Sequence, residues 1–328
     1  MNKLVLIAGG STLVYAVLAL VMGVLPGIAL SGMPPGPGVE PVTALQSKGR
    51  AIYVANGCSY CHTQQVRPLP QDKIFGRPSA PGDFAYQTPE LLGSERTGPD
   101  LTNVGSTKPS DVWQYIHLYD PRAVEPESIM PNFKFLFRVV DQVPVGDTAV
   151  PVPAAFAPGA GKVIPTQKAK ALVAYLLSLK QQPIPGYAGH AGAALAAPVP
   201  APGSAAPATP AGGAGYRYDA AKGAALFMAN CSACHQATGE GIPGAFPPLK
   251  GNAAVDNPDP TLHIHTVLQG AHGVTIGGVE YTSVMPPFAG QLSDAQIADI
   301  INHERSSWGN HARPVTPAGV AAARSKSP

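Results

Sequence analysis

Two five-residue stretches of this sequence place a histidine directly after a spaced pair of cysteines. Residues three apart on a helical turn lie on one face, so both thiols of a pair can reach the two vinyl groups of one porphyrin. The histidine then lies where a ring nitrogen can bind the iron. The pattern Cys-x-x-Cys-His is typical of c-type haem attachment, so the sequence predicts two covalently bound haem c groups. The predicted attachment residues are Cys58, Cys61, His62, Cys231, Cys234 and His235.

Two other kinds of site share part of this pattern. A Cys-x-x-Cys pair also occurs as a redox-active dithiol and as half of a zinc site. A dithiol does not need a histidine directly after it in two places. A zinc site needs further ligands at short spacing, and neither region offers a second cysteine pair. All four cysteines lie in the two stretches, so none is left for a disulfide. Haem attachment is favoured, and it places both domains outside the cytoplasmic membrane, where c-type maturation occurs.

A methionine thioether opposite the histidine gives a high-potential haem suited to electron transfer. Met130 and Met285 are the candidates, one after each motif, and each is followed by a proline. Proline keeps the preceding residue extended, which suits a loop that presents a side chain to a metal. The alternatives are a flexible core role for either methionine, and His117 as the ligand of the first iron. The other methionines lie near the N-terminus or on the helix of the second motif, and they are Met1, Met22, Met33 and Met228.

A proline carbonyl is expected to orient each haem-binding histidine. In c-type cytochromes such a carbonyl binds the other ring nitrogen, which fixes the ring and raises its basicity. Pro99 is the candidate partner of His62, and Pro247 is the candidate partner of His235. An ordinary turn at Gly-Pro is the alternative for Pro99. Four other histidines of the second domain are expected to be surface or core polar residues, and they are His263, His265, His272 and His303.

The segment 4–30 contains no charged side chain. A helix needs about 20 apolar residues to cross the hydrocarbon core of a membrane. The apolar region of a signal peptide has only about 7 to 15 residues, so an uncleaved anchor is favoured over a cleaved signal. Pro26 is expected to mark its outer end. Lys3 precedes the segment, which puts the N-terminus in the cytoplasm. We expect a single-pass protein of the cell inner (cytoplasmic) membrane, with the haem domains on the periplasmic side.

Helical patterns surround the first motif. Thr43 and Gln46 form the capping box of a helix, on which a glycine and an aromatic residue stand one turn apart. That pair suits a close crossing with the last helix of the domain, expected at 167–180. A middle helix is expected at 109–119, and the stretch 143–161 is expected to be an exposed loop.

The second motif repeats this arrangement. Asp219 is expected to cap a helix at 220–230, a middle helix is expected to end at Gly270, and Ser293 with Gln296 starts the last helix.

The expected fold is mainly α: one N-terminal transmembrane helix followed by two class I cytochrome c-type helical domains, joined by a Pro/Ala-rich linker. The low charged fraction of 13% and the net charge of +2 argue against a nucleic-acid binder. The linker should let the second domain sample more than one docking surface. The expected boundaries are 1–30 for the anchor, 31–182 for the first domain, 183–215 for the linker, 216–312 for the second domain and 313–328 for a C-terminal tail.

Residues 41 to about 138 resemble subunit II of the cbb-type (C-family) haem-copper oxidases, a membrane-anchored monohaem cytochrome c subunit. The matching strings follow the order of that family: GRAIY at 49–53, GC at 57–58, CHTQQVRP at 61–68, GSERTGPDL at 93–101, HLYDPR at 117–122 and PESIMP at 126–131. The resemblance implies that Met130 ligates the first haem and that the domain passes electrons to the catalytic subunit, which holds the low-spin and oxygen-reducing haems.

The resemblance also implies that Arg67, Arg96 and Arg122 bind haem propionates or the partner subunit, because arginine binds carboxylates in a bidentate way. Solvated surface charges are the alternative. The chain departs from the family after the first domain, because subunit II normally ends after one haem. The extra domain resembles class I cytochrome domains of membrane alcohol dehydrogenases at Ser293-Asp294 and at 305–310. It is expected to replace part of the multihaem subunit that normally feeds subunit II.

The sequence therefore predicts a membrane-anchored dihaem electron-transfer subunit of a cbb-type terminal oxidase in aerobic or microaerobic respiration. Electrons would enter at the second haem from a soluble or membrane cytochrome donor, pass to the first haem, and leave for the catalytic subunit. The chain shows no catalytic centre of its own. Two alternatives remain. One is an electron-transfer subunit of a membrane dehydrogenase or nitric oxide reductase. The other is a dihaem peroxidase, which needs one iron with an open position and is disfavoured by the two methionines.

Overall fold

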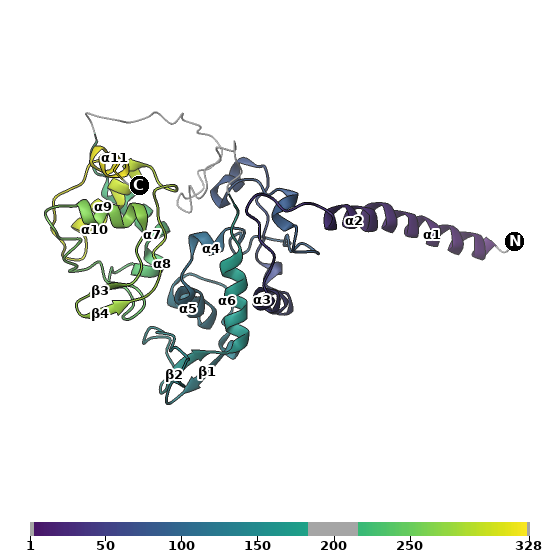
Figure 1. Cartoon of the computed structure of the whole chain (residues 1–328), viewed down its shortest axis with the longest axis horizontal. Helices are drawn as coiled ribbons and strands as arrows, with labels where there is room; N and C mark the ends of the chain where they lie inside the picture. The colour runs from purple at the N-terminus through teal and green to yellow at the C-terminus, as the bar shows by residue number, and fades with distance from the viewer. Residues whose placement is uncertain (1–2, 183–215, 327–328) are drawn as a thin grey trace.

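The computed structural model describes residues 3–182 and 216–326, so the expected linker lies outside the described residues. The described chain is mainly helical, with two small hairpins as its sheet structure. An N-terminal helical rod leads into a first domain that ends with helix α6. A second domain carries the green and yellow segments (Figure 1).

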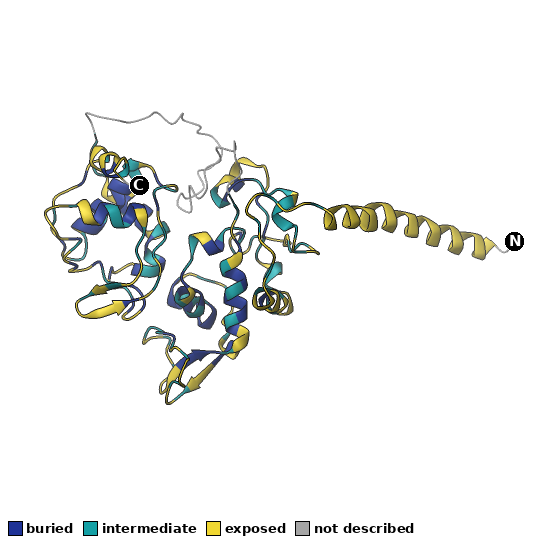
Figure 2. Cartoon of the chain, viewed as in Figure 1, coloured by how far each residue is buried: buried dark blue, intermediate teal, exposed yellow. Residues whose placement is uncertain are grey.

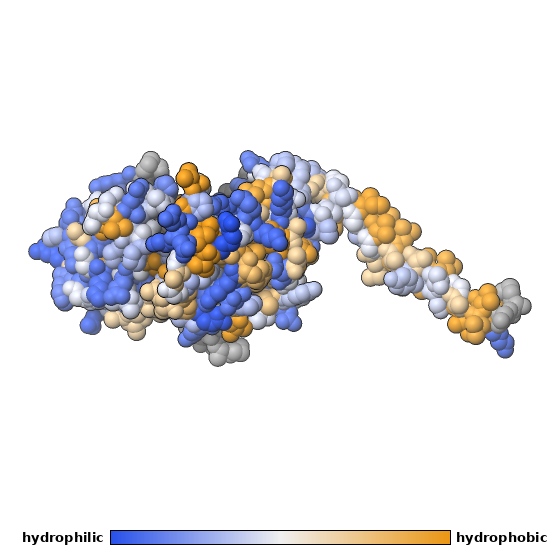
Figure 3. Space-filling view, turned by 90° about the horizontal axis from the view of Figure 1, so that it is seen from below, coloured by the Kyte–Doolittle hydropathy of each residue, from blue (hydrophilic) through white to orange (hydrophobic). Residues whose placement is uncertain are grey.

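The N-terminal rod is helical from Lys3–Ser31, which makes it 29 residues long with a mean hydropathy of 2.4. It consists of α1 (Lys3–Ala19), a π-helical turn (Leu20–Val24) and α2 (Leu25–Ser31). Its residues are exposed, and apolar side chains cover much of its surface (Figures 2 and 3). The rod is long and apolar enough to cross a membrane. Pro26 does not end it, because that residue lies in the first turn of α2, where a missing backbone N–H is tolerated.

The first domain is built on the crossing of α3 (Ala44–Ala55) and α6 (Gln167–Ser178). The expected capping box is confirmed: Gln46 N donates to Thr43 Oγ1 over 3.2 Å, and Thr43 N donates to Gln46 Oε1 over 2.8 Å. Gly49 lies at the crossing, where a Cβ atom would overlap the carbonyl of Ala171 on α6. Tyr53 is buried and meets Tyr175 edge to face at 5.6 Å. The pattern of glycine and aromatic residue therefore predicted the crossing correctly.

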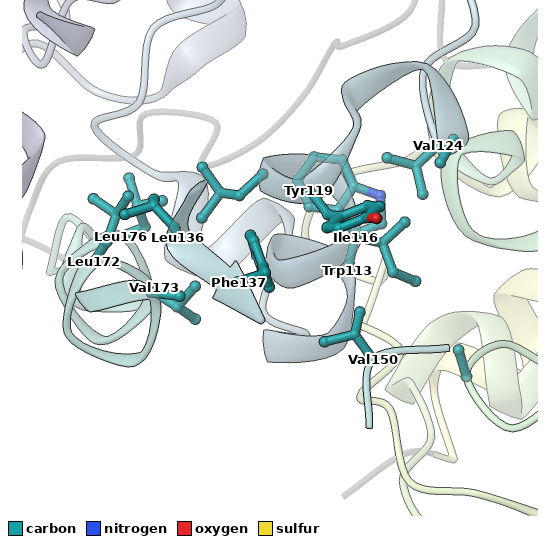
Figure 4. Close-up of a cluster of buried hydrophobic side chains, with 14 of the residues drawn as sticks. Trp113, Ile116, Tyr119, Val124, Leu136, Phe137, Val150, Leu172, Val173 and Leu176 are labelled. Atoms are coloured by element: carbon teal, nitrogen blue, oxygen red, sulfur yellow. The ribbon is translucent and has the colours of Figure 1, made fainter. Parts of the chain in front are cut away.

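The remainder of the first domain packs on α6. The short helix α4 (Val104–Thr107) and the middle helix α5 (Asp111–Tyr119) precede an antiparallel hairpin, β1 (Phe137–Val140) and β2 (Lys162–Pro165). Helix α5 begins at Asp111 and not at Pro109, because the hydroxyl of Ser110 accepts from Trp113 N and caps it. The hairpin was not predicted, and it closes the base of the loop 141–161. Apolar side chains from α5, α6 and the hairpin form one buried cluster (Figure 4).

The second domain repeats the crossing with α7 (Ala220–Asn230) and α10 (Asp294–Ser306). A Cβ atom at Gly223 would lie 2.7 Å from the carbonyl oxygen of Asp299 on α10. The predicted caps are confirmed at Asp219 and at Ser293. Between the two helices lie α8 (Ser232–His235), α9 (Thr261–Gln269), β3 (Val274–Ile276) and β4 (Val279–Tyr281).

Residues after 312 differ from the expected tail. They form α11 (Pro317–Arg324), whose Val320 is fully buried in the core of the second domain. Polar contacts also hold this segment against α10: Asn302 Nδ2 donates to the carbonyl of Val315 over 2.9 Å, and Arg324 pairs with Asp294 over 2.8 Å. The described structure of the second domain therefore extends to residue 326. The segment is rich in alanine, so its few buried apolar positions could not be recognised from the sequence.

Candidate haem-binding sites

The first motif follows α3 across a single left-handed residue. Gly57 has φ +69°, and it turns the chain into a short 3-10 helix at Cys58–Tyr60. The amide of His62 donates to the carbonyl of Cys58 over 3.1 Å, so one tight turn carries both thiols and the imidazole. Glycine suits this position because it reaches positive φ without the steric penalty of a side chain.

The ring of His62 is oriented by the carbonyl that the sequence predicted. Its Nδ1 atom lies 2.8 Å from the carbonyl oxygen of Pro99. A carbonyl oxygen only accepts, so Nδ1 carries the proton and Nε2 keeps its lone pair for a metal. Burial lowers the pKa of His62, which favours the neutral imidazole that binds iron, although the Pro99 carbonyl acts in the opposite direction. Gly98 lies so close to the ring that a Cβ atom there would overlap it.

The second motif has the same arrangement on a helical turn. Helix α8 carries Cys234 and His235, and the amide of His235 donates to the carbonyl of Cys231 over 2.9 Å. His235 Nδ1 lies 2.9 Å from the carbonyl oxygen of Pro247, which confirms the predicted partner. Burial lowers the pKa of His235. Both motifs therefore present a neutral imidazole with Nε2 available.

The second site opens into a cavity of about 500 Å³. Four predicted site residues line it together: Cys231, Cys234, His235 and Met285. The rest of the wall is largely apolar and comes from the loop before α9, from α9 and α10 with the segment between them, and from residues 107–113 of the first domain. An apolar cavity with two thiols, an imidazole and a thioether fits a covalently held haem, since these are the groups that such a haem uses.

Backbone contacts hold Met285 at the cavity wall. Its amide donates to the carbonyl of Ala271 over 2.8 Å, and Ala271 N donates back over 3.2 Å. The close approach of the Met285 backbone to the end of α9 requires a glycine just before Ala271. Gly270 has φ +77°, and a Cβ atom there would overlap the carbonyl of Met285. The C-terminal glycine of α9 therefore also makes room for the candidate ligand.

Two candidates for the sixth ligand of the first site lie on different segments. Met130 is partly buried and packs on the core of the first domain. Its carbonyl accepts from Arg122 over 3.3 Å, so the loop that carries it is held in place. His117 lies on α5, where burial is the main cause that lowers its pKa to about 3. Met130 and His117 therefore both remain candidates for the sixth ligand of the first iron. Met228, excluded from ligation by its position on α7, is 52% exposed.

The thiol environment bears on the alternative chemistries. Burial raises the pKa of Cys58 and of Cys234 to about 11. A redox dithiol instead needs a lowered thiol pKa, because the thiolate is the reactive form. Within residues 3–182 and 216–326, no three His, Cys, Asp or Glu side chains are grouped to hold a metal ion. The raised pKa of these thiols disfavours the redox-dithiol interpretation.

An ionic network that the sequence did not predict supports the first site. Asp72 is fully buried, and its carboxylate pairs with Arg96 over 2.7 Å and with Arg67 over 2.8 Å. Arg96 also donates to the hydroxyl of Thr63 over 2.7 Å, and this hydroxyl donates to Asp100 over 2.6 Å. The network joins the chain after His62 to the loop that carries Pro99. It consequently fixes the carbonyl on which the orientation of His62 depends.

The three arginines named by the resemblance thus have carboxylate partners inside the chain. Arg67 and Arg96 bind Asp72, and Arg122 lies 3.3 Å from Asp120. Arg67 remains about half exposed, whereas Arg96 is mostly buried. No sequence pattern indicated the buried position of Asp72, because a single aspartate in a polar turn ordinarily lies in solvent.

A buried pair lines the second site. His263 Nε2 lies 2.6 Å from a carboxylate oxygen of Glu304, and both side chains are about 5% exposed or less. Both residues lie at the cavity wall. The sequence predicted a surface or core polar role for His263, and the structure places it in the core. Glu304 was not predicted, since α10 shows no signal beyond its helical period.

Comparison with known proteins relates both parts of the chain to cytochrome families. Residues 2–152 match the family described as cytochrome c oxidase, mono-heme subunit/FixO, and residues 220–308 match the cytochrome c family. The chain is 42% identical over 94 residues to cytochrome c-552 of Thermus thermophilus, covering 27% of this chain and 70% of that protein.

Larger relatives share only a part with this chain. It is 38% identical over 90 residues to the cytochrome c subunit of alcohol dehydrogenase (quinone) from Gluconobacter oxydans, covering 27% of this chain and 19% of that subunit. It is 36% identical over 108 residues to the gluconate 2-dehydrogenase cytochrome c subunit of Pantoea cypripedii, covering 32% of this chain and 24% of that subunit. The chain thus spans about a fifth to a quarter of the length of these two dehydrogenase subunits.

Domains of the cytochrome c type carry covalently bound haem c, and the described sites fit that group in residue type and arrangement. The chain therefore belongs to the c-type cytochromes, as an electron-transfer protein that joins a FixO-type domain to a class I cytochrome c domain.

Proposed function

We propose that this chain is the membrane-anchored dihaem cytochrome c subunit of a cbb-type terminal oxidase. It would carry electrons from a periplasmic cytochrome donor to the catalytic subunit of a haem-copper oxidase. One observation supports the proposal most directly: in each domain a proline carbonyl holds the imidazole of the motif. This arrangement occurs twice in a chain whose first part matches the FixO family.

Each predicted site residue has a role in this proposal. The paired thiols hold the two haems by thioether bonds, and His62 and His235 bind the irons through Nε2. Met130 and Met285 supply the opposite thioether ligands. A haem held in this way supplies an iron that gains and loses one electron. A soft thioether ligand and an apolar wall both favour a high reduction potential.

The N-terminal rod is assigned here to a single crossing of the inner membrane, with both haem domains on the periplasmic side. Its 29 residues exceed the roughly 20 that a crossing needs. The only charged residue at its start is Lys3, which agrees with a cytoplasmic N-terminus. The domain boundaries at 31–182 and from 216 onwards follow from the same proposal.

Purification from detergent tests this function directly. An affinity-tagged chain should bring down a partner that contains b-type haem and copper, and pyridine haemochrome analysis should give two c-type haems per copy of this chain. A variant with both Cys231→Ser and Cys234→Ser is the matched control. It should retain one c-type haem and the same partner. Recovery of a quinoprotein dehydrogenase in place of the oxidase subunit would reject the oxidase assignment.

A second candidate has a specific observation in its favour. Cytochrome subunits of alcohol and gluconate dehydrogenases are among the relatives of this chain. In that case the chain would accept electrons from a membrane dehydrogenase. The redox state of the haems distinguishes the two functions. If the chain serves the oxidase, membranes that lack the oxidase subunit should lose its oxidation. If it serves the dehydrogenase, membranes that lack the dehydrogenase should lose its reduction.

A further inference from the structure

The cavity of the second domain is closed on one side by the first domain. Its wall continues from Cys234 and His235 to Lys108, which follows α4, and to Trp113 in the first turn of α5. The second motif therefore faces α5, as the position of α8 beside the first domain also shows (Figure 1). Four residues of the second domain belong to the same buried apolar cluster as Trp113, with exposed fractions of 6% or less: Ala233, Ile242, Ala245 and Phe246.

Charged groups of the first domain also reach the second motif. Lys108 lines the cavity of the second motif together with Cys234 and His235. Lys108 Nζ lies 3.9 Å from the carboxylate of Glu125 and 5.1 Å from the centre of the Trp113 ring. The contact between the two domains is therefore apolar at its centre and has an ion pair beside it.

Trp113 continues the contact into the first domain. Its ring stacks on the ring of His117, with centroids 4.6 Å apart and planes 12° apart. Trp113 Nε1 and His117 Nδ1 are buried, and neither has a hydrogen-bond partner within the described residues. Cys58 and Met130 of the first site pack against the same buried cluster that contains Trp113. Trp113, with His117 stacked on it, thus belongs to one buried cluster that also includes residues of both motifs.

We propose that Trp113, stacked on His117, is the residue that couples the two haem sites of this chain for direct electron transfer. This inference rests on the proposed passage of electrons from the second site to the first. One electron moves, so one site is oxidised as the other is reduced, and no bond forms or breaks. A closely packed aromatic path transmits an electron better than a gap filled with solvent. Trp113 would act as a positioning residue that keeps the path packed.

The chain contains two tryptophans, and this gives a matched control. Trp308 packs on Phe227 and His303 in the second domain and does not line the cavity. We would compare Trp113→Leu, Trp113→Phe and Trp308→Leu in the full-length protein with both haems, in detergent. Pulse radiolysis introduces one electron per molecule, and absorbance then follows its redistribution between the haems. Redox titration and visible spectra of each variant check that potentials and ligands are unchanged.

We expect Trp113→Leu to slow the redistribution about tenfold, equivalent to about 1.4 kcal/mol in the barrier. Trp113→Phe should restore most of the rate, and Trp308→Leu should leave it unchanged. A wild-type rate in Trp113→Leu, at unchanged potentials, would overturn the role of Trp113.

A measurement on the wild-type protein covers the case in which Trp113→Leu fails to fold. In the fully oxidised protein, electron paramagnetic resonance should show magnetic interaction between the two ferric haems. Two magnetically isolated signals would overturn the direct coupling. Neither experiment requires an oxidase, so a failure here is distinguishable from a failure of the proposed function, which is decided by the partner that co-purifies.

Discussion

The ring of His62 donates a 2.8 Å hydrogen bond to the carbonyl oxygen of Pro99, and the residue before that proline packs on the same ring. Gly98→Ala should displace His62, because the added Cβ would overlap the imidazole. We expect weaker iron ligation in the first domain, seen as a lower haem content and a changed potential of that haem alone. Gly159→Ala is the control, since a Cβ there meets open space. Equal haem content and potential in both variants would contradict this role of Gly98.

If Met130 and Met285 are axial ligands, the same substitution at each should have the same effect on its own haem. Met130→His and Met285→His should each retain haem, and each should lower the potential of one haem by a few tenths of a volt, within the range of about 0.8 V that axial ligands span. Met228→His on the exposed face of α7 should change neither potential. Spectroelectrochemical titration measures all three variants. If Met130→His leaves both potentials unchanged, the sixth ligand is not Met130, and His117 takes its place.

Asp72 should control the acid stability of the first domain. Its two arginine partners hold the pKa of the buried carboxyl below the ordinary value of about 3.9. A lowered pKa in the folded state stabilises the domain above the pKa of the unfolded carboxyl, and this contribution is lost as the pH falls toward the folded pKa. Asp72→Asn should reduce the free energy of unfolding at pH 7 by about 3 kcal/mol, since it leaves a buried guanidinium without its counter-charge.

Thermal unfolding of the first domain, followed by its haem absorbance between pH 3 and pH 7, tests this expectation. The wild type should lose stability below about pH 4, and Asp72→Asn should show a smaller loss over the same interval. Glu95→Gln is the control, because it removes one carboxylate from an exposed neighbouring residue. Identical pH profiles for Asp72→Asn and the wild type would show that the network does not depend on the charge of Asp72.

The buried Glu304 should tune the second haem. Its carboxylate lies 2.6 Å from His263 and acts electrostatically on His235. A negative charge near the iron favours the oxidised state, so Glu304→Gln should raise the potential of the second haem and leave the first unchanged. Glu240→Gln, at an exposed ion pair with Lys250, serves as the control. A redox titration in which both variants match the wild type would remove Glu304 from the site.

Local patterns predicted the helices well where a cap or a glycine fixes the backbone. Thr43, Asp219 and Ser293 each begin a helix through side-chain oxygens that satisfy the first free amides. Gly270 ends α9 because only a residue that tolerates positive φ fits there. Such signals lie within a few residues of each other, and sequence reading is reliable at that distance.

Long-range polar contacts were harder to predict. The pairing of Asp72 with Arg96 joins residues that are 24 positions apart, and the pairing of His263 with Glu304 spans 41 positions. The types of these residues would suit solvent equally well, so neither pair has a sequence signature. The carbonyl partners of His62 and His235 were predictable because a proline after each motif follows the pattern of c-type cytochromes.

Helix α11 determines where a fragment that contains only the second domain can end. The match to the cytochrome c family ends at residue 308, yet Arg305, which is 1% exposed, donates to the carbonyl of Arg313 over 2.8 Å. Ending the protein at 308 would remove this acceptor, the Val315 carbonyl and the apolar cover that Val320 gives the core. A protein fragment that begins near residue 216 should therefore extend to residue 326. A fragment that ends at residue 308 would leave the buried guanidinium of Arg305 short of a hydrogen-bond acceptor and would expose the apolar core.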